Sequence, residues 1–273
     1  MLDVAQDYAL HYLHEQGIFG FGVVLKGGTS LRKLRAGNAG RFSTDLDFAA
    51  PDAETAALVL DTLDNATTHD VAFRIGERGP MRGHLEIDTP LGRPAIASRI
   101  EVSARPLWLP AEDLTPVALP VHSGYEFDMP AIPTPTLEEA IAEKLAAWRR
   151  RAKVRDLYDL YWYGQATFDE SLVRRLLVLK AWHDTVDDKL GNAPFEPADL
   201  LDNFDTSRLP SEDIGLLTQP AEPQHWLNHM ITRFSFLAAL DGVEAQIAAC
   251  SPRDRRLVNQ TVAQLAALHE AAN

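Results

Sequence analysis

The sequence predicts an α+β protein, with a mixed-sheet domain in its first half and a bundle of helices in its second half. In the first half, short apolar runs alternate with glycines and prolines, which is typical of strands joined by turns. In the second half, apolar residues recur at the spacing of amphipathic helices. A proline-rich connector with short extended pieces, residues 106–135, separates the two. We therefore expect two domains, residues 1–130 and residues 131–273.

The elements of the first half follow from these patterns in chain order. A helix is expected over residues 2–16, because its apolar residues fall on one face and Gly17 ends the pattern. An apolar run over residues 21–25 predicts a buried strand, which enters a turn at Gly27 and Gly28. The further elements expected are a helix from Thr29 or Ser30 toward residue 35, a strand at 45–49, a helix at 52–64 and strands at 71–75, 81–88 and 95–104.

Helices account for most of the second half. Thr136 followed by Glu139 resembles a capping box, in which paired side chains begin a helix. Helical patterns cover residues 137–164, 169–190, 222–249 and 253–271.

Composition excludes several classes of protein. The net charge of −13 argues against coating of DNA without regard to sequence, which needs a basic surface. No apolar run reaches the roughly 18 residues of a membrane span, and the first residues lack the basic-then-apolar order of a secretory signal. The single cysteine, Cys250, excludes an internal disulfide and fits a reducing compartment. We therefore expect a cytoplasmic protein that binds no membrane.

A glycine turn, Lys26-Gly27-Gly28-Thr29-Ser30, joins a predicted strand to a predicted helix. Glycines let the backbone approach a ligand closely, and the first turn of a helix offers unpaired N–H groups that suit phosphates. A purely structural turn is the alternative, since the Gly-Lys-Ser/Thr ending of a Walker loop is absent.

An acidic strand follows the turn, within Arg41-Phe42-Ser43-Thr44-Asp45-Leu46-Asp47-Phe48. Alternate residues of a strand project to the same face, so Asp45 and Asp47 point together. Neighbouring carboxylates repel each other unless a cation lies between them, and hard oxygen ligands suit Mg²⁺. A solvated strand face is the alternative, but the position of the pair directly after the glycine turn favours a metal site.

Glu101 is a candidate third carboxylate for the same metal. It lies in the later strand Arg99-Ile100-Glu101-Val102-Ser103, and sequence spacing does not fix its position relative to the pair. An exposed glutamate on an edge strand is the alternative.

The most basic segment of this acidic chain spans residues 144–155. If the segment is one helix, positions 144, 148, 151 and 155 share a face that suits the phosphates of a nucleotide or of RNA. Trp148 or Tyr158 would then stack on a base. The alternative is a solvated helix whose arginines pair with acids one turn away, such as Arg155 with Asp159.

Taken in order, the motifs resemble those of the AbiEii-type (MenT-type) nucleotidyltransferase toxins, of the polymerase-β-like nucleotidyltransferase superfamily. They are Lys-Gly-Gly-Thr-Ser-Leu, Arg-Phe-Ser-Thr-Asp-Leu-Asp-Phe, Ile-Glu-Val-Ser, Glu-Lys-Leu and Arg-Asp-Leu-Tyr-Asp-Leu. The resemblance covers residues 20–165. The first two motifs occur in many nucleotidyltransferases, whereas the last block points to this family.

The resemblance implies a nucleotidyltransferase-fold domain in residues 1–130, a helical domain in residues 131–273 and a set of site residues. The predicted catalytic residues are Asp45, Asp47, Lys144 and Asp156, with Asp159 competing with Asp156 for the role of the late acid. Asp45 and Asp47, with Glu101 as a candidate, would bind Mg²⁺. The predicted nucleotide-binding residues are Lys26, Gly27, Gly28, Thr29, Ser30, Arg41 and Ser43. The predicted RNA-binding residues are Arg149, Arg150, Arg151, Lys153 and Arg155.

The function implied is that of a toxin from a bacterial toxin–antitoxin system. Such an enzyme would transfer nucleotides from a nucleoside triphosphate to an RNA acceptor, the 3′ end of tRNA, and so block translation, with an antitoxin protein as its partner. One alternative is a nucleotidyltransferase for small molecules such as aminoglycosides, which would need no basic helix. Another is an inactive nucleotidyltransferase fold used as a binding module, against which the presence of both Asp45 and Asp47 argues.

Overall fold

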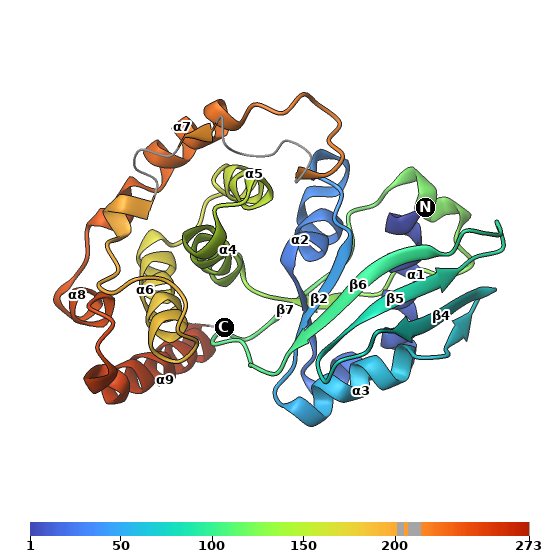
Figure 1. Cartoon of the computed structure of the whole chain (residues 1–273), viewed down its shortest axis with the longest axis horizontal. Helices are drawn as coiled ribbons and strands as arrows, with labels where there is room; N and C mark the ends of the chain where they lie inside the picture. Colours follow the sequence, from blue (N-terminus) through green and yellow to red (C-terminus); the bar gives the residue numbers. More distant parts are fainter. Residues whose placement is uncertain (201–204, 207–213, 273) are drawn as a thin grey trace. The chain divides into compact units, whose positions relative to one another are not determined.

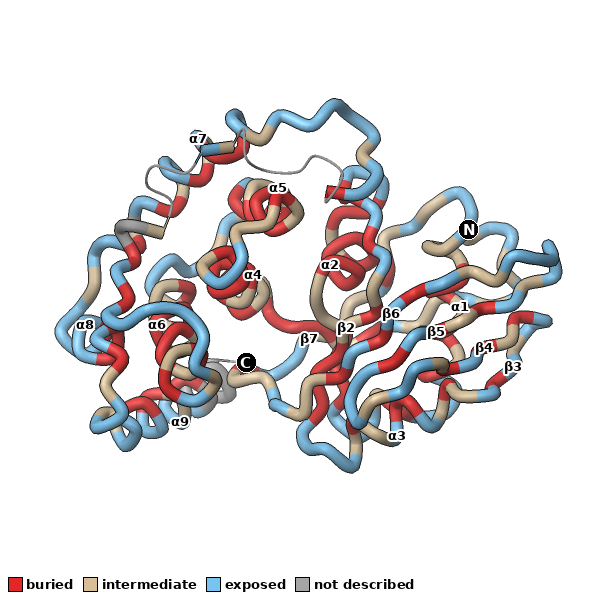
Figure 2. The backbone as a smooth tube through the Cα atoms, viewed as in Figure 1, coloured by how far each residue is buried: buried red, intermediate tan, exposed pale blue. Residues whose placement is uncertain are grey.

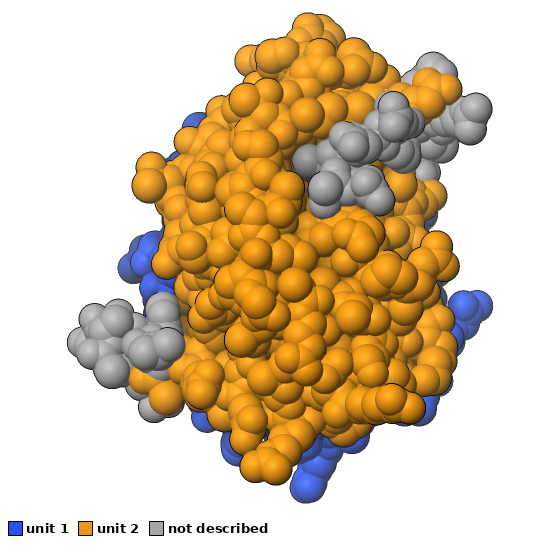
Figure 3. Space-filling view, turned by 90° about the vertical axis from the view of Figure 1, so that its left-hand side faces the viewer, with its two compact units in different colours: residues 1–107, 111–135 blue, residues 108–110, 136–273 orange. Residues whose placement is uncertain are grey.

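Residues 1–200, 205–206 and 214–272 are described by the computed structural model of the chain (Figure 1). The fold divides into two units, which are described one at a time. Unit 1 comprises residues 1–107 and 111–135, and unit 2 comprises residues 108–110 and 136–273 (Figure 3). The domain boundary between residues 130 and 131 stays a prediction.

A mixed sheet of six strands forms the centre of unit 1 (Figure 1). Its strands are β1 (Val24–Lys26), β2 (Asp45–Ala49), β3 (Thr67–Thr68), β4 (Val71–Gly76), β5 (Arg82–Asp88) and β6 (Ile96–Ser103). They lie in the order β1-β2-β6-β5-β4-β3, in which β2 and β6 run parallel and the other neighbours antiparallel. The mixed sheet predicted for the first half is therefore confirmed.

Buried and exposed residues alternate along β4, β5 and β6 (Figure 2), which places the core of unit 1 on one face of this sheet. In β6, Ile100 and Val102 are buried, whereas Arg99 and Glu101 are exposed. The helices α1 (Leu2–Glu15) and α3 (Ala53–Leu63) contribute their apolar residues to the same core. The other face carries mainly polar and charged side chains, among them Arg74, Glu86 and Glu101.

The segment before β1 differs from the prediction. Residues 18–21 form the short helix η1 (Ile18–Phe21), and the strand begins only at Val24, whereas the apolar run predicted a strand from Phe21. Gly17 and Gly22 bound η1 with positive φ values of 72° and 78°, so the chain turns twice before it extends.

The proline-rich connector contains the short extended pieces expected of it. They are the strands β7 (Glu112–Leu114) and β8 (Ile132–Thr134), which pair with each other, and the helix η4 (Pro120–Gly124) lies between them.

Helices form unit 2, as the periodicity of the second half predicts. They are α4 (Leu137–Arg151), α5 (Val154–Tyr163), α6 (Glu170–Val186), α7 (Pro223–Arg233), α8 (Gly242–Ala248) and α9 (Arg255–Ala272), with the short helices η5 (Pro197–Leu200), η8 (Ser235–Ala238) and η9 (Pro252–Asp254). The Thr136 side chain accepts a hydrogen bond from the Glu139 N–H at 3.3 Å, which confirms Thr136 as the cap of α4. The capping box is not completed, because the Glu139 carboxylate instead accepts hydrogen bonds from the N–H groups of Trp108 and Leu109. Helix α4 packs against α5 and α6.

Two helices replace the single one that the pattern over residues 137–164 predicts. Ala152 adopts a left-handed conformation, with φ of 44°, and ends α4 before α5 begins. The pattern over residues 222–249 is likewise divided among α7, η8 and α8. Among the helices of residues 1–200 and 214–272, none qualifies as a membrane span.

Candidate active site

The glycine turn of unit 1 lies where β1 ends. Gly27 has a positive φ of 75°. Helix α2 (Gly27–Ser30) starts at this glycine and continues into η2 (Leu31–Ala36). The helix therefore begins at the glycines themselves rather than at a cap on Thr29 or Ser30, and the N–H groups of the turn belong to its first turn.

Side chains of three predicted site residues lie against this turn. A Cβ atom built on Gly27 would overlap the carboxylate of Asp47. A Cβ atom built on Gly28 would lie 2.5 Å from Nη2 of Arg41 and 2.9 Å from Oγ of Ser43. Gly27 is therefore required by close approach and by its positive φ, whereas a side chain at position 28 would displace the Arg41 guanidinium. The structure brings Asp47, Arg41 and Ser43 to the turn.

Alanine at position 27 is expected to lower transfer activity about 100-fold, because the new methyl group displaces the Asp47 carboxylate. The left-handed backbone adds a stability cost of about 1–2 kcal/mol. Gly17→Ala is the matched control, since Gly17 has φ of 72° and its Cβ would meet nothing within 4 Å. Steady-state kinetics and thermal melts of both variants test this expectation. Equal activity of the two variants would contradict it.

Asp45 and Asp47 share one face of β2, as predicted, and are partly exposed, while Leu46 between them is buried. On the neighbouring strands, Lys26 and Glu101 both lie opposite Asp47. Opposite residues of adjacent strands project to the same side of a sheet. The pair, the glycine-turn lysine and the candidate third carboxylate therefore belong to one charged face of unit 1.

Arg99 is a residue of this face that the sequence did not identify. It lies opposite Asp45 in the parallel β2–β6 pair. Its guanidinium donates from Nε to Oδ1 of Asp45 at 3.2 Å and from Nη2 to Oδ2 at 3.1 Å. Arg99 is visible in the sequence two positions before Glu101, but its contact with Asp45 depends on a strand register that spacing does not give.

The donor set of this face fits Mg²⁺ bound together with a nucleotide. Two carboxylates project from β2, and in the part of the chain that the structure describes, no three or more His, Cys, Asp or Glu side chains are arranged to hold a metal ion. Mg²⁺ is typically held by one or two carboxylates, with substrate phosphates and water as its remaining ligands. Asp45 and Asp47 suit this role, and a metal contact of Glu101 stays a prediction.

The hydroxyl groups of the turn are engaged within unit 1. Thr29 is fully buried, and its Oγ1 donates to the backbone carbonyl of Asp45. Ser30 is also buried, and its hydroxyl forms a hydrogen bond with that of Thr134 in β8. These bonds attach the turn to β2 and to β8. Nucleotide binding by Thr29 and Ser30 stays a prediction.

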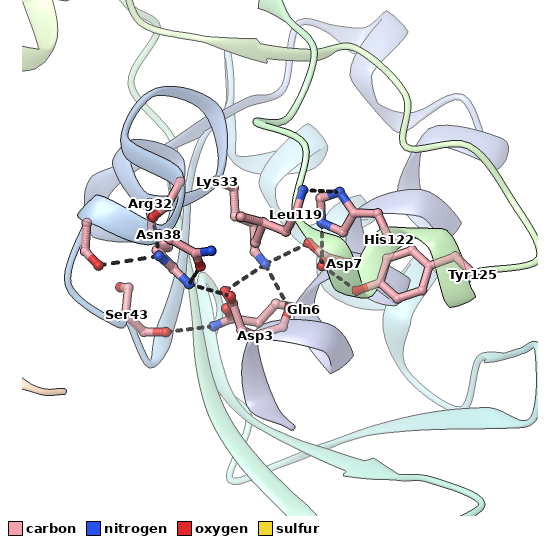
Figure 4. Close-up of polar contacts among 12 residues, drawn as sticks. Asp3, Gln6, Asp7, Arg32, Lys33, Asn38, Ser43, Leu119, His122 and Tyr125 are labelled. Atoms are coloured by element: carbon pink, nitrogen blue, oxygen red, sulfur yellow. Dashed lines mark hydrogen bonds and ion pairs between the residues drawn. The ribbon is translucent and has the colours of Figure 1, made fainter. Parts of the chain in front are cut away.

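Buried ion pairs attach η2 to α1 (Figure 4). Lys33 Nζ lies 3.0 Å from Oδ1 of Asp3 and 2.7 Å from Oδ1 of Asp7, and it also donates to the Asp3 carbonyl at 2.7 Å. Arg32 adds a contact of 3.3 Å with Oδ2 of Asp3. The two acids of α1 are thus paired with two basic residues of η2, and these ion pairs fix the helix that follows the glycine turn against α1.

The same network reaches the segment that contacts the glycine turn (Figure 4). Gln6 Nε2 donates to the backbone carbonyl of Ser43 at 3.3 Å. The second oxygen of Asp7 accepts a hydrogen bond of 2.7 Å from Tyr125. Burial raises the pKa of the Tyr125 hydroxyl, and the Asp7 carboxylate raises it further, so this hydroxyl stays a donor. Helix α1 therefore positions Ser43 as well as η2.

Acid is expected to weaken unit 1 through Asp3. Burial favours the neutral form of Asp3, but Lys33 and Arg32 outweigh it and lower the pKa of this carboxyl. A carboxyl with a depressed folded-state pKa stabilises the fold above its unfolded value of about 3.9, and this contribution is lost as the pH falls through the folded value. Asp3→Asn should therefore be less stable than the parent at neutral pH, and the difference should shrink below about pH 4.

Hydrogen–deuterium exchange of β2 and β6 peptides between pH 3 and pH 6 measures this difference. Parallel stability profiles of the two proteins across that range would show that the Asp3 ion pairs do not stabilise unit 1.

In unit 2, four charged residues of α4 and α5 meet in a group here called the Lys144 cluster, formed by Lys144, Arg151, Asp156 and Asp159, of which Arg151 is exposed. Asp156 and Asp159 are fully buried. Lys144 Nζ lies 2.6 Å from Oδ2 of Asp159 and 3.8 Å from Oδ1 of Asp156. Arg151 forms a fork on Asp156, with two hydrogen bonds of 2.7 Å. Both candidate late acids thus contact Lys144, and the catalytic roles of Lys144 and Asp156 stay predictions.

The single basic stripe expected across residues 144–155 is wrong, because Ala152 ends α4 within it. Trp148 is 2% exposed, and its indole N–H donates to the Leu200 carbonyl at 3.0 Å, so it belongs to the core of unit 2. This burial contradicts its expected stacking on a base. Tyr158 packs edge-on against Trp226, with ring centroids 5.1 Å apart.

Three of the cations predicted to bind RNA make contacts within unit 2. Arg149 donates to Oγ1 of Thr185 at 3.0 Å, Arg150 forms an ion pair of 2.7 Å with Asp184, and Arg151 belongs to the Lys144 cluster. These contacts differ from the pairing of arginines with acids one turn away, because Arg149 and Arg150 contact α6 and Arg151 reaches Asp156 in α5. RNA binding stays a prediction for Arg149, Arg150, Arg151, Lys153 and Arg155.

A family model matches most of the chain. It is described as the nucleotidyl transferase AbiEii toxin of type IV toxin–antitoxin systems, and it matches residues 16–247. A comparison with curated protein sequences found no match.

Solved structures add two similarities. The structure of MenT4, a nucleotidyltransferase toxin from Mycobacterium tuberculosis H37Rv, is 45% identical to this chain, with a TM-score of 0.91 over 97% of this chain and 92% of that one. The structure of JHP933 from Helicobacter pylori is 19% identical, with a TM-score of 0.49 over 85% of this chain and 92% of that one. The first similarity extends over both units of the fold.

Proposed function

The chain belongs to the AbiEii family of nucleotidyltransferase toxins, and we propose that it transfers nucleotides from a nucleoside triphosphate to the 3′ end of tRNA with the help of Mg²⁺. The family is that of toxins in type IV toxin–antitoxin systems. Modification of the tRNA acceptor end would block translation, and a cognate antitoxin protein would control the enzyme.

One observation carries the proposed chemistry: the glycine turn and the carboxylates of β2 meet in unit 1. Gly27 approaches the Asp47 carboxylate so closely that no side chain fits between them. Backbone N–H groups at the start of a helix suit phosphate oxygens, and carboxylates suit the cation that accompanies a triphosphate. This juxtaposition supports a site for a metal–triphosphate complex.

In the proposed reaction, different residues of unit 1 bind the triphosphate and the metal ion. The N–H groups of Gly27 and Gly28, with Arg41 and Ser43 beside them, would hold the triphosphate. Asp45 and Asp47 would hold Mg²⁺, which supplies positive charge against the phosphates when it is bound. The acceptor hydroxyl attacks the α-phosphorus, and pyrophosphate leaves. Positioning and charge neutralisation supply most of the rate enhancement in such phosphoryl chemistry.

Unit 2 supports an RNA acceptor through its charge. The most basic segment of the chain lies at the α4–α5 junction. We include Lys144 and Asp156 in the catalytic set and the five cations from Arg149 to Arg155 in the RNA-binding set. In this proposal, these residues give up hydrogen bonds and ion pairs within unit 2 when they bind the substrate.

The identity of the acceptor is tested by following the transfer of a radioactively labelled nucleotide. The purified chain is incubated with each of the four α-labelled nucleoside triphosphates, Mg²⁺, and either total tRNA or a mixture of aminoglycosides. We expect tRNA to become labelled with at least one of the four nucleoside triphosphates, and we expect no labelled aminoglycoside. Labelled aminoglycoside without labelled tRNA would establish the small-molecule alternative. Tight nucleotide binding without transfer to either acceptor would favour a binding module.

A further inference from the structure

One side chain on the charged face of unit 1 competes with the proposed metal for its ligand. Arg99 takes both oxygens of Asp45 in a fork, with bonds of 3.2 and 3.1 Å. A guanidinium is permanently charged and only donates hydrogen bonds, so it cannot share those oxygens with a cation without strong repulsion. Binding of a metal by Asp45 therefore requires Arg99 to move.

The exposure of the pair makes this movement inexpensive. The Arg99 side chain is 63% exposed and that of Asp45 is 20% exposed. Ion pairs in contact with water contribute only about 0.2–1 kcal/mol. The fork between Arg151 and Asp156 in unit 2 has the same geometry, but its carboxylate is fully buried. Of these two forks, only the one between Arg99 and Asp45 is readily opened.

The second partner that we infer for the Arg99 guanidinium, once it has left Asp45, is the phosphate chain of the proposed triphosphate. Asp45 and Asp47 lie on the strand that follows the glycine turn, and Asp47 itself contacts the turn. A guanidinium in the register position beside Asp45 is thus close to where the proposed triphosphate binds. Arginine pairs with phosphate through the same fork that it forms with a carboxylate.

We propose that Arg99 is a displaceable counter-ion. It neutralises Asp45 while the site is empty, and it transfers to the phosphates of the nucleoside triphosphate when metal and nucleotide bind. This inference rests on the proposed function, since it assumes that Asp45 binds the metal. It assigns to Arg99 two effects of opposite sign: Arg99 weakens the binding of metal alone and strengthens the binding of nucleotide.

The first effect is measured on the whole chain without nucleotide. Titration with Mn²⁺, followed by the electron paramagnetic resonance signal of the free ion, gives the metal affinity. Arg99→Ala should bind Mn²⁺ about two- to fivefold more tightly than the parent, which corresponds to the loss of a competing exposed ion pair. Arg74→Ala is the matched control, because Arg74 forms a similarly exposed cross-strand pair with Glu86, 65% and 38% exposed, elsewhere in the same sheet. It removes the same charge and should leave the affinity unchanged.

The second effect is measured by calorimetric titration with a triphosphate analogue whose α,β-bridging oxygen is replaced by methylene, in the presence of Mn²⁺. Arg99→Ala should bind the analogue about 10- to 100-fold more weakly, the range expected for loss of hydrogen bonds between charged groups. Arg99→Lys keeps the charge without the fork, and it should recover part of this affinity. The melting temperature of each variant, followed by circular dichroism, shows that the comparison is made on folded protein.

Opposite shifts in the two affinities support the proposal. An Arg99→Ala variant with unchanged or weaker Mn²⁺ binding, or with unchanged affinity for the analogue, overturns it. Asp47→Asn separates this failure from failure of the proposed function. If the parent, Asp45→Asn and Asp47→Asn all bind Mn²⁺ equally, the carboxylates are not the metal site, and both proposals fall. If Asp47→Asn loses Mn²⁺ while Arg99→Ala matches the parent, only the role of Arg99 is refuted.

Discussion

Replacing Asp45 or Asp47 by asparagine is expected to lower the rate of nucleotide transfer on the order of 10³-fold while the chain remains folded. Each substitution preserves the size of the side chain and removes one charged oxygen ligand. The loss falls on the charge stabilisation of the transition state rather than on folding, because both residues are partly exposed and the ion pair between Asp45 and Arg99 is in contact with water.

The measurement is a rate of label transfer at saturating nucleotide, compared with the melting temperature of each variant. Asp88→Asn is the control, since Asp88 is an exposed acid at the end of β5 in the same sheet. It should retain the parent rate. Variants of Asp45 and Asp47 that transfer nucleotide at the rate of the Asp88 variant would refute the metal assignment.

The second large effect is expected in the Lys144 cluster, where Lys144→Met should lower the free energy of unfolding of unit 2 by about 3 kcal/mol. Lys144 is 9% exposed, and its ammonium group lies 2.6 Å from the fully buried carboxylate of Asp159. Methionine has a similar volume but no charge, so the substitution removes the nearest cation from a buried anion. Removal of one partner of a buried pair is more destabilising than replacement of both.

Urea unfolding followed by tryptophan fluorescence reports on this unit selectively, because all 5 tryptophans of the chain lie in unit 2. The double variant Lys144→Met with Asp159→Leu should recover part of the loss, and Asp159→Leu alone should be destabilised. If the loss of stability in the double variant equals the sum of the losses in the two single variants, the two side chains do not interact.

The same double variant separates the two roles of Lys144. If Lys144 also contacts phosphates during catalysis, the double variant should regain stability and still lack transfer activity. Recovery of activity together with stability would show that the Lys144 cluster serves the fold alone.

Much of the proposed site could be predicted because it depends on local patterns. The strand β2 was expected over residues 45–49 and forms there, since acidic and apolar residues alternate along it. The same alternation gave the common face of Asp45 and Asp47. The glycine turn was also located correctly, because two adjacent glycines between a strand and a helix favour a close backbone approach.

What the sequence could not supply depends on contacts between distant segments and on unusual backbone conformations. The fork between Arg99 and Asp45 requires β2 and β6 to pair in parallel, a register that no local signal specifies. Ala152 ends α4 in a left-handed conformation that alanine rarely adopts. Because nothing in the sequence signals this break, the helical pattern over residues 137–164 predicts one continuous helix. Sequence spacing also does not show that Asp156 and Asp159 are fully buried and that both contact Lys144.

We propose that unit 1 uses Asp45 and Asp47 to add nucleotides to the 3′ end of tRNA. Sequencing of tRNA 3′ ends after incubation with the chain, nucleoside triphosphates and Mg²⁺ tests it most directly. We expect tRNA ends extended by one or more nucleotides with the parent chain, and unextended ends with Asp47→Asn or after addition of a chelator. Unextended ends with the parent chain, or extension that persists in Asp47→Asn, would contradict it.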